Sequence, residues 1–358
     1  MNRIPALDGI RAIAVTLVVL SHGGKGGIIP GGFGVTVFFF LSGYLITSLL
    51  RAENAKTGTI SLRDFYIRRT LRIMPPLYIT LLVCAALVAT GLIVQPGRVD
   101  PFTVFSQAAF FHNYASLWGD PISLPITGVW SLAVEEHYYL IFPLFYLLML
   151  RKLSRPVQVG ICLAMCAVVL GVRFANTRLL ADYDVNYLWT HTRIDSILFG
   201  AILALANNPA MDERAWRPRG WHAIGALGLI VLTLAIRNPV FRETLRYTLQ
   251  GAALYALFGY AVSSGGIVAR LLGSTPAQIV ARYSYTIYLV HAPMLKLIEQ
   301  RGLLPHWSVL PAAIVLTFAY AAAMYAFVEY PLGRWRHRLH SEPVGELEPP
   351  VAPIDKDR

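Results

Sequence analysis

The fold of this protein follows from one stretch near its N-terminus, ALDGIRAIAVTLVVLSH, which covers residues 6–22. The stretch is apolar over most of its length, and that length is about the minimum for a helix that crosses a bilayer. It nevertheless contains an acid, a guanidinium and an imidazole, at Asp8, Arg11 and His22. Ionisable groups inside membrane helices mark functional sites by default. The stretch therefore predicts a membrane helix that carries a candidate catalytic site.

The spacing of these residues predicts that they share one face of the helix. His22 follows Arg11 by eleven residues, and eleven steps of about 100° return to within about 20° of the starting direction. Asp8 precedes Arg11 by three residues, which places it on the same face. The simpler interpretation is that Asp8 and Arg11 form an interfacial pair that anchors the helix, with His22 at its far end. It explains each residue separately but not their common register.

Composition extends the membrane interpretation to the whole chain. Of its 358 residues, 56% are hydrophobic and 14% are charged, and the mean hydropathy is +0.53, whereas soluble domains are about 25% charged. We predict an all-α, polytopic integral membrane bundle of about ten transmembrane helices that forms one domain over residues 1–340. The stretch 341–358 is rich in proline and acids and is predicted to be a disordered cytoplasmic tail.

The predicted spans are apolar segments of membrane length. They are residues 6–22, 33–50, 75–94, 129–150, 157–174, 190–207, 221–236, 246–262, 283–299 and 307–328. The net charge of +11 lies mainly in the short connectors between them, so no nucleic-acid surface is predicted. Eighteen basic residues fall in alternate connectors and seven in the others, Arg173 among the seven. This asymmetry predicts that both termini are cytoplasmic.

Small residues inside the apolar segments are interpreted as packing positions. Cys84, Cys162 and Cys166 have neither disulfide-framework nor metal-ligand spacing, so they are predicted to be core residues, and no metal site is predicted. Ser42 and Gly43 fall in mid-membrane, where small residues let another backbone approach closely. A direct role for Ser42 is the alternative.

Two adjacent acids, Glu135 and Glu136, lie in the fourth predicted span, toward the end of the bundle that His22 reaches. A carboxylate that orients an imidazole is the usual partner of a catalytic histidine. Adjacent helical residues diverge by about 100°, so only one of the two acids can share a site with His22. Acids near a helix N-terminus are also favoured by the helix dipole, which is the structural alternative.

A basic cluster, Arg68, Arg69 and Arg72, occupies one side of a predicted helix in a connector. The guanidinium fork matches phosphate oxygens, so the cluster is a candidate phosphate site. The alternative is a topology signal that also anchors lipid headgroups.

Two further polar groups lie in later apolar segments. Arg193 and Asp195 head one of them, and they are interpreted either as an internal structural pair or as substrate contacts. Tyr288 and His291 share a helical face with Ser284, which makes them candidate substrate-binding residues. An interfacial belt of aromatic residues is the alternative for this face.

Six collinear blocks of the sequence, between about residue 3 and residue 331, resemble the acyltransferase-3 family of membrane O-acyltransferases. They are LDGIRAIAVTLVVLSH, GGFGVTVFFFLSGYLI, FYIRRTLRIMPPLY, VWSLAVEEHYYLIFPL, RIDSILFG and SYTIYLVHAPML. The resemblance implies a ten-helix enzyme that moves an acyl group, usually acetyl, from cytoplasmic acyl-CoA to a sugar hydroxyl of an exported or cell-surface glycan or glycolipid. Some members of the family modify small molecules instead. The expected location is the bacterial inner membrane, with membrane lipids and the acceptor as partners.

The family's functional residues carry over to this sequence by their motifs. Its arginine and histidine fall on Arg11 and His22, its basic cluster on Arg68, Arg69 and Arg72, and its acidic motif on Glu135 and Glu136. We expect His22 to act as a general base or as a transient acyl carrier, with Arg11 and Asp8 along the path between donor and acceptor. The basic cluster would then hold the CoA phosphates.

One expectation concerns a further domain, and rival functions also remain open. Many relatives carry a C-terminal esterase-like domain, and none is expected here. A proton-coupled transporter and a glycolipid flippase are the rival functions, because transporters also place ionisable residues in membrane helices.

Overall fold

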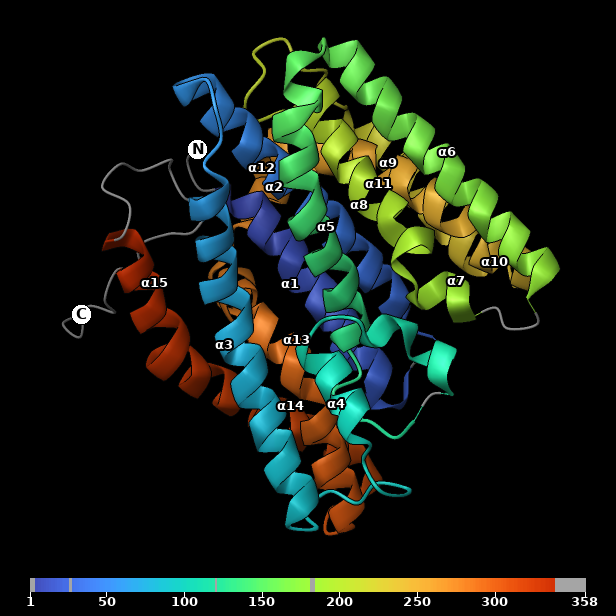
Figure 1. The fold of residues 1–358 in the computed structure, drawn as a ribbon, viewed down its shortest axis with the longest axis vertical. Coiled ribbons are helices and arrows are strands. Elements are labelled where there is room, and N and C mark those ends of the chain that lie inside the picture. Colours follow the sequence, from blue (N-terminus) through green and yellow to red (C-terminus); the bar gives the residue numbers. More distant parts are fainter. Residues whose placement is uncertain (1–3, 26–27, 120, 181–183, 339–358) are drawn as a thin grey trace.

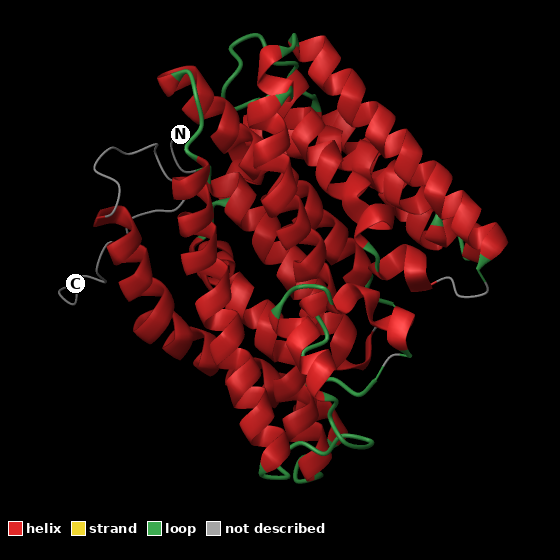
Figure 2. Ribbon diagram, in the orientation of Figure 1, coloured by secondary structure: helices red, strands yellow, loops and turns green. Residues whose placement is uncertain are grey.

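A chain that crosses a membrane must satisfy its backbone hydrogen bonds internally, and helices do so within each segment. The computed structural model describes residues 4–25, 28–119, 121–180 and 184–338, and every regular element in this part of the chain is a helix (Figures 1 and 2). The predicted all-α class is therefore confirmed. Residues 339–340 at the end of the predicted membrane domain, and the predicted tail 341–358, lie outside the described residues.

Each predicted span overlaps one of the long helices of the described chain. These helices are α1 (Pro5–Leu20), α2 (Gly31–Thr57), α3 (Leu62–Ala89), α5 (Val129–Leu148), α6 (Arg155–Leu179), α8 (Thr190–Ala206), α9 (Gly220–Ala235), α11 (Leu245–Ser263), α13 (Thr275–Arg301) and α14 (His306–Met324). Shorter helices connect or extend them: α4 (Pro101–Ala108), α7 (Asp184–Leu188), α10 (Pro239–Glu243), α12 (Gly266–Leu272) and α15 (Tyr330–Arg338). The π-helical turns η1 (Ser21–Lys25) and η4 (Tyr325–Glu329) and the 3₁₀ turns η2 (His112–Trp118) and η3 (Leu150–Lys152) complete the chain.

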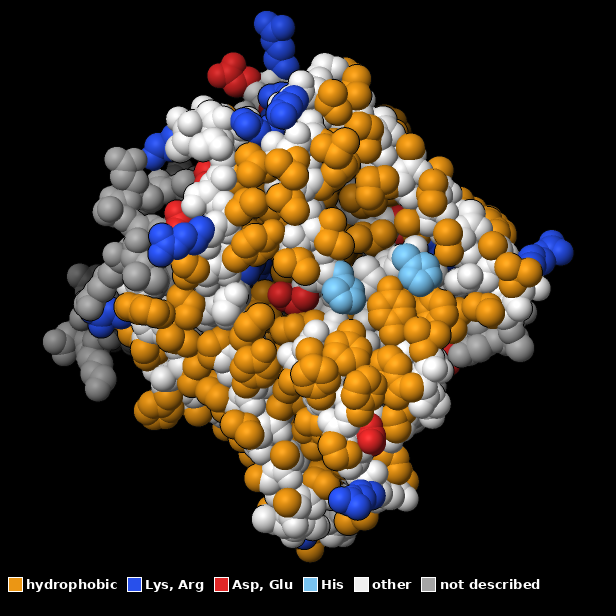
Figure 3. All heavy atoms as spheres, viewed as in Figure 1, with side chains coloured by type: hydrophobic (Ala, Val, Ile, Leu, Met, Phe, Trp, Pro, Cys, Tyr) orange, Lys and Arg blue, Asp and Glu red, His pale blue; other side chains and the backbone are white. Residues whose placement is uncertain are grey.

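Several of these helices are suited to a bilayer by length and composition. Within the described residues, five are long and apolar enough to cross a membrane, namely α1, α2, α3, α6 and α14 with their extensions. The number is six if α11 and α12, which meet at 97°, form one broken span. Apolar side chains cover most of the face shown in Figure 3. The polytopic membrane fold is confirmed, and the count of ten spanning helices stays a prediction.

The centre of the bundle is the crossing of α2 and α8, the most extensive contact between any two elements. The two backbones touch, because a Cβ atom on Gly43 would collide with the carbonyl oxygen of Ile197, and one on Gly200 with that of Phe40. The prediction that a small residue lets another backbone approach is confirmed at Gly43. The three cysteines are buried and free, as predicted for core residues.

The position of α1 prepares the site. This helix packs against α2 on one side and against α13 on another, and Figure 1 shows it in the middle of the bundle. Gly9 makes the packing at its N-terminal end tight, because a Cβ atom there would clash with the backbone of Leu272, the last residue of α12. The opposite end of α1 therefore meets the middle of α13, where His291 lies.

Candidate active site

His22 lies in the π-helical turn η1 that follows α1. Its Nδ1 atom is 2.9 Å from the carbonyl oxygen of Val18, and the side chain is exposed. The non-helical backbone of this turn lies at Gly23 and Gly24, after His22. His22 therefore occupies the end of the helix that carries Arg11.

The partner of His22 is a second histidine. Nε2 of His291 lies 3.3 Å from Nδ1 of His22, and the ring centroids are 4.9 Å apart in an edge-on arrangement. His291 is buried, with 3% of its surface exposed. The structure thus joins two predicted site residues that lie 269 positions apart in the chain.

The hydrogen bonds assign the tautomers of the pair when both rings are neutral. Nδ1 of His291 faces two carbonyl oxygens, those of Tyr288 at 2.8 Å and Ile287 at 3.2 Å, which only accept, so Nδ1 carries the proton and Nε2 a lone pair. Nδ1 of His22 then donates to this lone pair and to the carbonyl of Val18. The Nε2 atom of His22 is left unprotonated, as a base requires.

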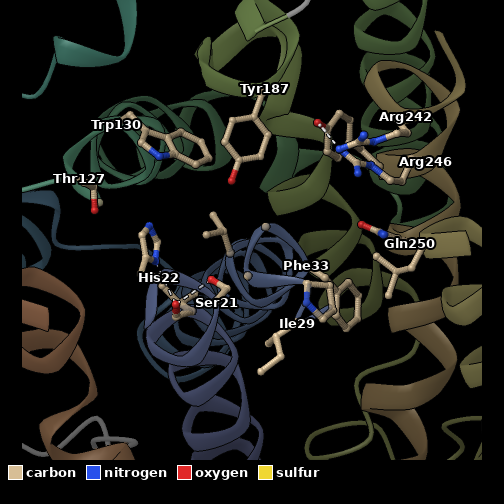
Figure 4. Close-up of a pocket in the computed structure, with 18 of the residues that line it drawn as sticks. Ser21, His22, Ile29, Phe33, Thr127, Trp130, Tyr187, Arg242, Arg246 and Gln250 are labelled. Carbon is tan, nitrogen blue, oxygen red and sulfur yellow. Dashed lines mark hydrogen bonds between the residues drawn. The ribbon is translucent and has the colours of Figure 1, made fainter. Parts of the chain in front are cut away.

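His22 and His291 open into a cavity of about 630 Å³, which is within the range of small-molecule sites. Figure 4 shows His22 on one side of it, with Trp130 and Tyr187 above and Arg242, Arg246 and Gln250 on the opposite side. The lining also includes Ser21, Thr127, Asp184, Arg237, Glu243, Tyr247 and Tyr288. Such a mixture of aromatic faces and hydrogen-bonding groups suits a polar, hydroxyl-bearing ligand.

Tyr288 connects α13 to α5 at the edge of this cavity. Its hydroxyl lies 2.5 Å from Oγ of Ser131, and Gly128, just before α5, leaves no room for a Cβ atom against its ring. The tyrosine is therefore held in a fixed orientation while it lines the cavity. This places Tyr288 beside His22 and His291, as expected of a shared substrate site.

Arg193 lies behind the cavity wall and is not part of the lining. Its guanidinium carbon is 4.0 Å from the ring centroid of Tyr247, 5.3 Å from that of Tyr187 and 5.9 Å from that of Trp130. The side chain is fully buried and donates to Oγ1 of Thr36 over 3.1 Å. A desolvated cation on aromatic faces contributes about 2 kcal/mol or more. Arg193 thus supports three rings that line the cavity.

Asp195 forms an internal pair, but not with Arg193. Its carboxylate accepts two hydrogen bonds from Arg173 of α6, at 2.7 and 2.9 Å, and both side chains have no exposed surface. This corrects the assignment of Arg173 to a connector. The bidentate pair compensates the burial of both charges and joins α6 to α8 at this point.

The acids of α5 occupy a separate polar cluster. Glu135 accepts hydrogen bonds from Ser42 at 3.0 Å and from Tyr139 at 3.1 Å. Arg69 stacks over the ring of Tyr139 at 5.3 Å and, like Arg11, lies within electrostatic range of Glu135. Among the described residues, no hydrogen bond joins Glu135 or Glu136 to His22. The carboxylate expected to orient this histidine is replaced by His291.

The other charges expected near this path are divided among different partners. Arg11 donates to Asp8 over 3.2 Å, which forms the pair predicted from their spacing. Arg68 lies 3.6 Å from Glu53, and Arg69 turns to Tyr139. The three arginines of the basic cluster are all half-buried.

The sequence did not predict the part of the cavity lined by Arg237, Arg242 and Arg246. Arg237 and Arg242 entered the sequence analysis only as connector charges, and Arg246 and Gln250 were not considered. Arg237 and Arg242 lie just before and in α10, and Arg246 and Gln250 lie in α11. No spacing rule separates these residues from ordinary surface arginines, because only the packing of α11 against α8 turns them toward His22.

The fold and this site define a class, namely a polytopic membrane protein with a pair of histidines at a polar cavity inside a helical bundle. Comparison with known families assigns the chain to a family. A family model described as an acyltransferase domain matches residues 4–327, so the chain belongs to the acyltransferase-3 family, as the sequence motifs predict. Membership of this family favours acyl transfer over the transporter and flippase alternatives.

Curated relatives of the chain carry acetyltransferase names. The O-acetyltransferase OatA of Staphylococcus aureus is 29% identical over 355 residues, in strains NCTC 8325 / PS 47, COL and MRSA252 alike. The match covers 92% of this chain and 57% of each relative. The chain therefore spans a little over half the length of these relatives. No solved structure matches the chain.

Proposed function

We propose that this protein is an integral-membrane O-acetyltransferase that transfers an acetyl group from cytoplasmic acetyl-CoA to a sugar hydroxyl of an exported or cell-surface glycan or glycolipid. Family membership and the O-acetyltransferase relatives support the reaction class. The observation that carries the proposal is the His22–His291 pair at the edge of a polar, aromatic-lined cavity. The protein would lie in the bacterial inner membrane with both termini in the cytoplasm.

The tautomer of His22 supports base chemistry at its Nε2 atom. This nitrogen would take the proton of the acceptor hydroxyl while the hydroxyl oxygen forms a bond to the thioester carbonyl carbon. The carbon–sulfur bond then breaks, and CoA leaves as a thiolate that takes the proton back. Alternatively, the Nε2 atom would itself attack the thioester carbonyl carbon and displace CoA. The acetyl group would then pass from His22 to the acceptor hydroxyl. Both routes need an unprotonated Nε2 atom.

Other residues would act through position and charge. His291 would hold the tautomer of His22, and Tyr288 with the aromatic wall over Arg193 would shape the acceptor side. Asp8, Arg11, Glu135 and Glu136 would line the path between donor and acceptor. Asp195 would serve through its pair with Arg173, which fixes α8.

His22 provides the direct test. Purified wild-type protein in nanodiscs should release CoA from acetyl-CoA and acetylate glycan isolated from a strain that lacks the gene. His22→Ala should abolish both, since general base catalysis alone contributes about 10²–10⁴-fold. His306→Ala is a matched control, because His306 is an exposed histidine outside the cavity. Full transfer by well-folded His22→Ala protein would remove His22 from the mechanism.

The donor site would be the basic cluster of α3. If Arg68, Arg69 and Arg72 bind CoA phosphates, each replacement by Gln should raise the KM for acetyl-CoA about tenfold or more, because charge-assisted hydrogen bonds are lost. Arg63→Gln, an exposed arginine earlier on the same helix, is the control and should leave this KM unchanged. Unchanged KM values in the three cluster variants would leave the cluster as a topology signal.

A further inference from the structure

Two guanidiniums that line the cavity have no partner among the described residues. Arg237 and Arg242 both line the cavity and are exposed. In the described part of the chain, neither guanidinium donates a hydrogen bond or forms an ion pair. Figure 4 places Arg242 beside Arg246 and across the cavity from His22. Two unpaired cations therefore face the same space as the histidine base.

The acids of the cavity do not neutralise these two charges. Glu243 is engaged by Arg246 at 3.4 Å and by the hydroxyl of Tyr247 at 2.8 Å, so its two oxygens are both in use. Asp184 lies at the start of α7 and interacts electrostatically with Tyr187. Three arginines against two carboxylates leave the lining with an excess of positive charge.

We propose that Arg237 and Arg242 bind an anionic group of the acceptor, a carboxylate or a phosphate, while the hydroxyl to be acetylated faces His22. The proposal rests on the function proposed above and narrows its substrate class from glycans in general to anionic ones. Guanidiniums bind both anions in bidentate geometry. The donor phosphates have a separate candidate site on α3, so the anion at Arg237 and Arg242 belongs to the acceptor.

The first experiment identifies the anion. Glycans and glycolipids from a strain that lacks the gene are separated by anion exchange into neutral, carboxylate-bearing and phosphate-bearing fractions, and each is incubated with the purified full chain and acetyl-CoA. Mass spectrometry should locate new acetyl groups in a carboxylate- or phosphate-bearing fraction, and the fraction tells which anion is bound. Acetylation confined to the neutral fraction would overturn the proposal but keep the proposed function. No acetylation and no CoA release would remove the proposed function itself.

The second experiment tests the two arginines with the acceptor fraction so identified. The double variant Arg237→Gln, Arg242→Gln should raise the KM for the acceptor at least about tenfold, with a smaller effect on kcat and none on the KM for acetyl-CoA. With Arg242→Lys in place of Arg242→Gln, the acceptor KM should rise less than in the double Gln variant, because lysine keeps the charge but not the fork of donors. Arg178→Gln removes a charge from an exposed arginine outside the cavity and should behave as wild type.

Two results would contradict this assignment. An unchanged acceptor KM in the double variant would make the arginines anchors for lipid headgroups. A raised KM for acetyl-CoA would assign them to the donor.

Discussion

At the scale of single residues, His22, the proposed base, contacts a second histidine and not an acid. His22 has its Nδ1 atom beside the carbonyl of Val18 and Nε2 of His291. A buried imidazole that keeps its own proton on Nδ1 presents only a lone pair to His22. His291 therefore acts as a positioning residue, and its effect should depend on its ability to accept a hydrogen bond.

This dependence can be tested with two substitutions of His291. His291→Ala removes the acceptor and should lower kcat for CoA release about tenfold or more, because His22 loses its fixed tautomer. His291→Gln offers an amide oxygen to the same N–H group and should recover part of the rate. The pH profile of kcat should shift in His291→Ala, which a purely structural loss would not cause. Equal rates in the two variants would contradict the positioning role.

At the scale of elements, the crossing of α2 and α8 holds the two halves of the site together. Ser42, which bonds to Glu135, lies next to Gly43 at the point of closest approach. Arg193, which supports the cavity wall, lies on α8. A change in the separation of these two helices would therefore displace residues of both polar clusters, the one around Glu135 and the cavity wall over Arg193.

Gly43→Ala should destabilise the protein, because the new methyl group meets the backbone carbonyl of Ile197 and the helices must separate. Overpacking of this kind costs about 1–3 kcal/mol. Gly160→Ala on α6 is the control, since nothing lies within 4 Å of its Cβ position and alanine has the higher helix propensity. Thermal unfolding in detergent should show a lower Tm for the first variant only. Equal Tm values would mean that the crossing is looser than described.

The connector after α8 carries an acid-sensitive contact. Partial burial would raise the pKa of Asp212, but hydrogen bonds from Arg51 and from the backbone N–H of Asn208 outweigh it and lower the pKa below its ordinary value. A carboxylate with a lowered pKa stabilises the fold above its unfolded pKa, and this contribution is lost as the pH falls through the folded value.

The Tm of the wild type should therefore fall between about pH 5 and pH 3 more steeply than that of Asp212→Asn. Glu213→Gln is the matched control, since Glu213 is the exposed acid next in sequence. It should keep the steep dependence of the wild type. If Asp212→Asn loses stability over this range as steeply as the wild type does, the contact does not contribute.

At the scale of the whole molecule, the distribution of charge sets the orientation. The asymmetry of basic residues between alternate connectors predicts that both ends are cytoplasmic. In this orientation the basic cluster of α3 would face the cytoplasm, where acyl-CoA is made. The cavity at the other end of α1 would face outward, where the proposed exported glycan is reached.

A reporter fused after Leu339 tests this orientation. Alkaline phosphatase, which is active only outside the cytoplasm, should be inactive at this position, and green fluorescent protein should fluoresce. The same reporters placed in the 237–244 connector should give the opposite result. An active phosphatase after Leu339 would invert the protein and place the basic cluster away from the CoA pool.

The sequence by itself determined the fold class and the family, and it supplied candidate site residues. Hydropathy acts locally, so apolar segments of spanning length predict helices without knowledge of their neighbours. The motif around Arg11 and His22 likewise lies within one helix and its turn. The pair of Asp8 with Arg11 followed from spacing alone.

Only the tertiary structure decided which polar groups meet. Asp195 pairs with Arg173 and not with Arg193, which is nearer in the sequence. His22 contacts His291 and not an acid. These pairings depend on helix crossings that join segments far apart in the sequence. A charged side chain buried between helices needs a partner, and a neighbouring helix at the crossing supplies it. The arginine side of the cavity formed in the same way, since no periodicity within α10 and α11 points toward His22.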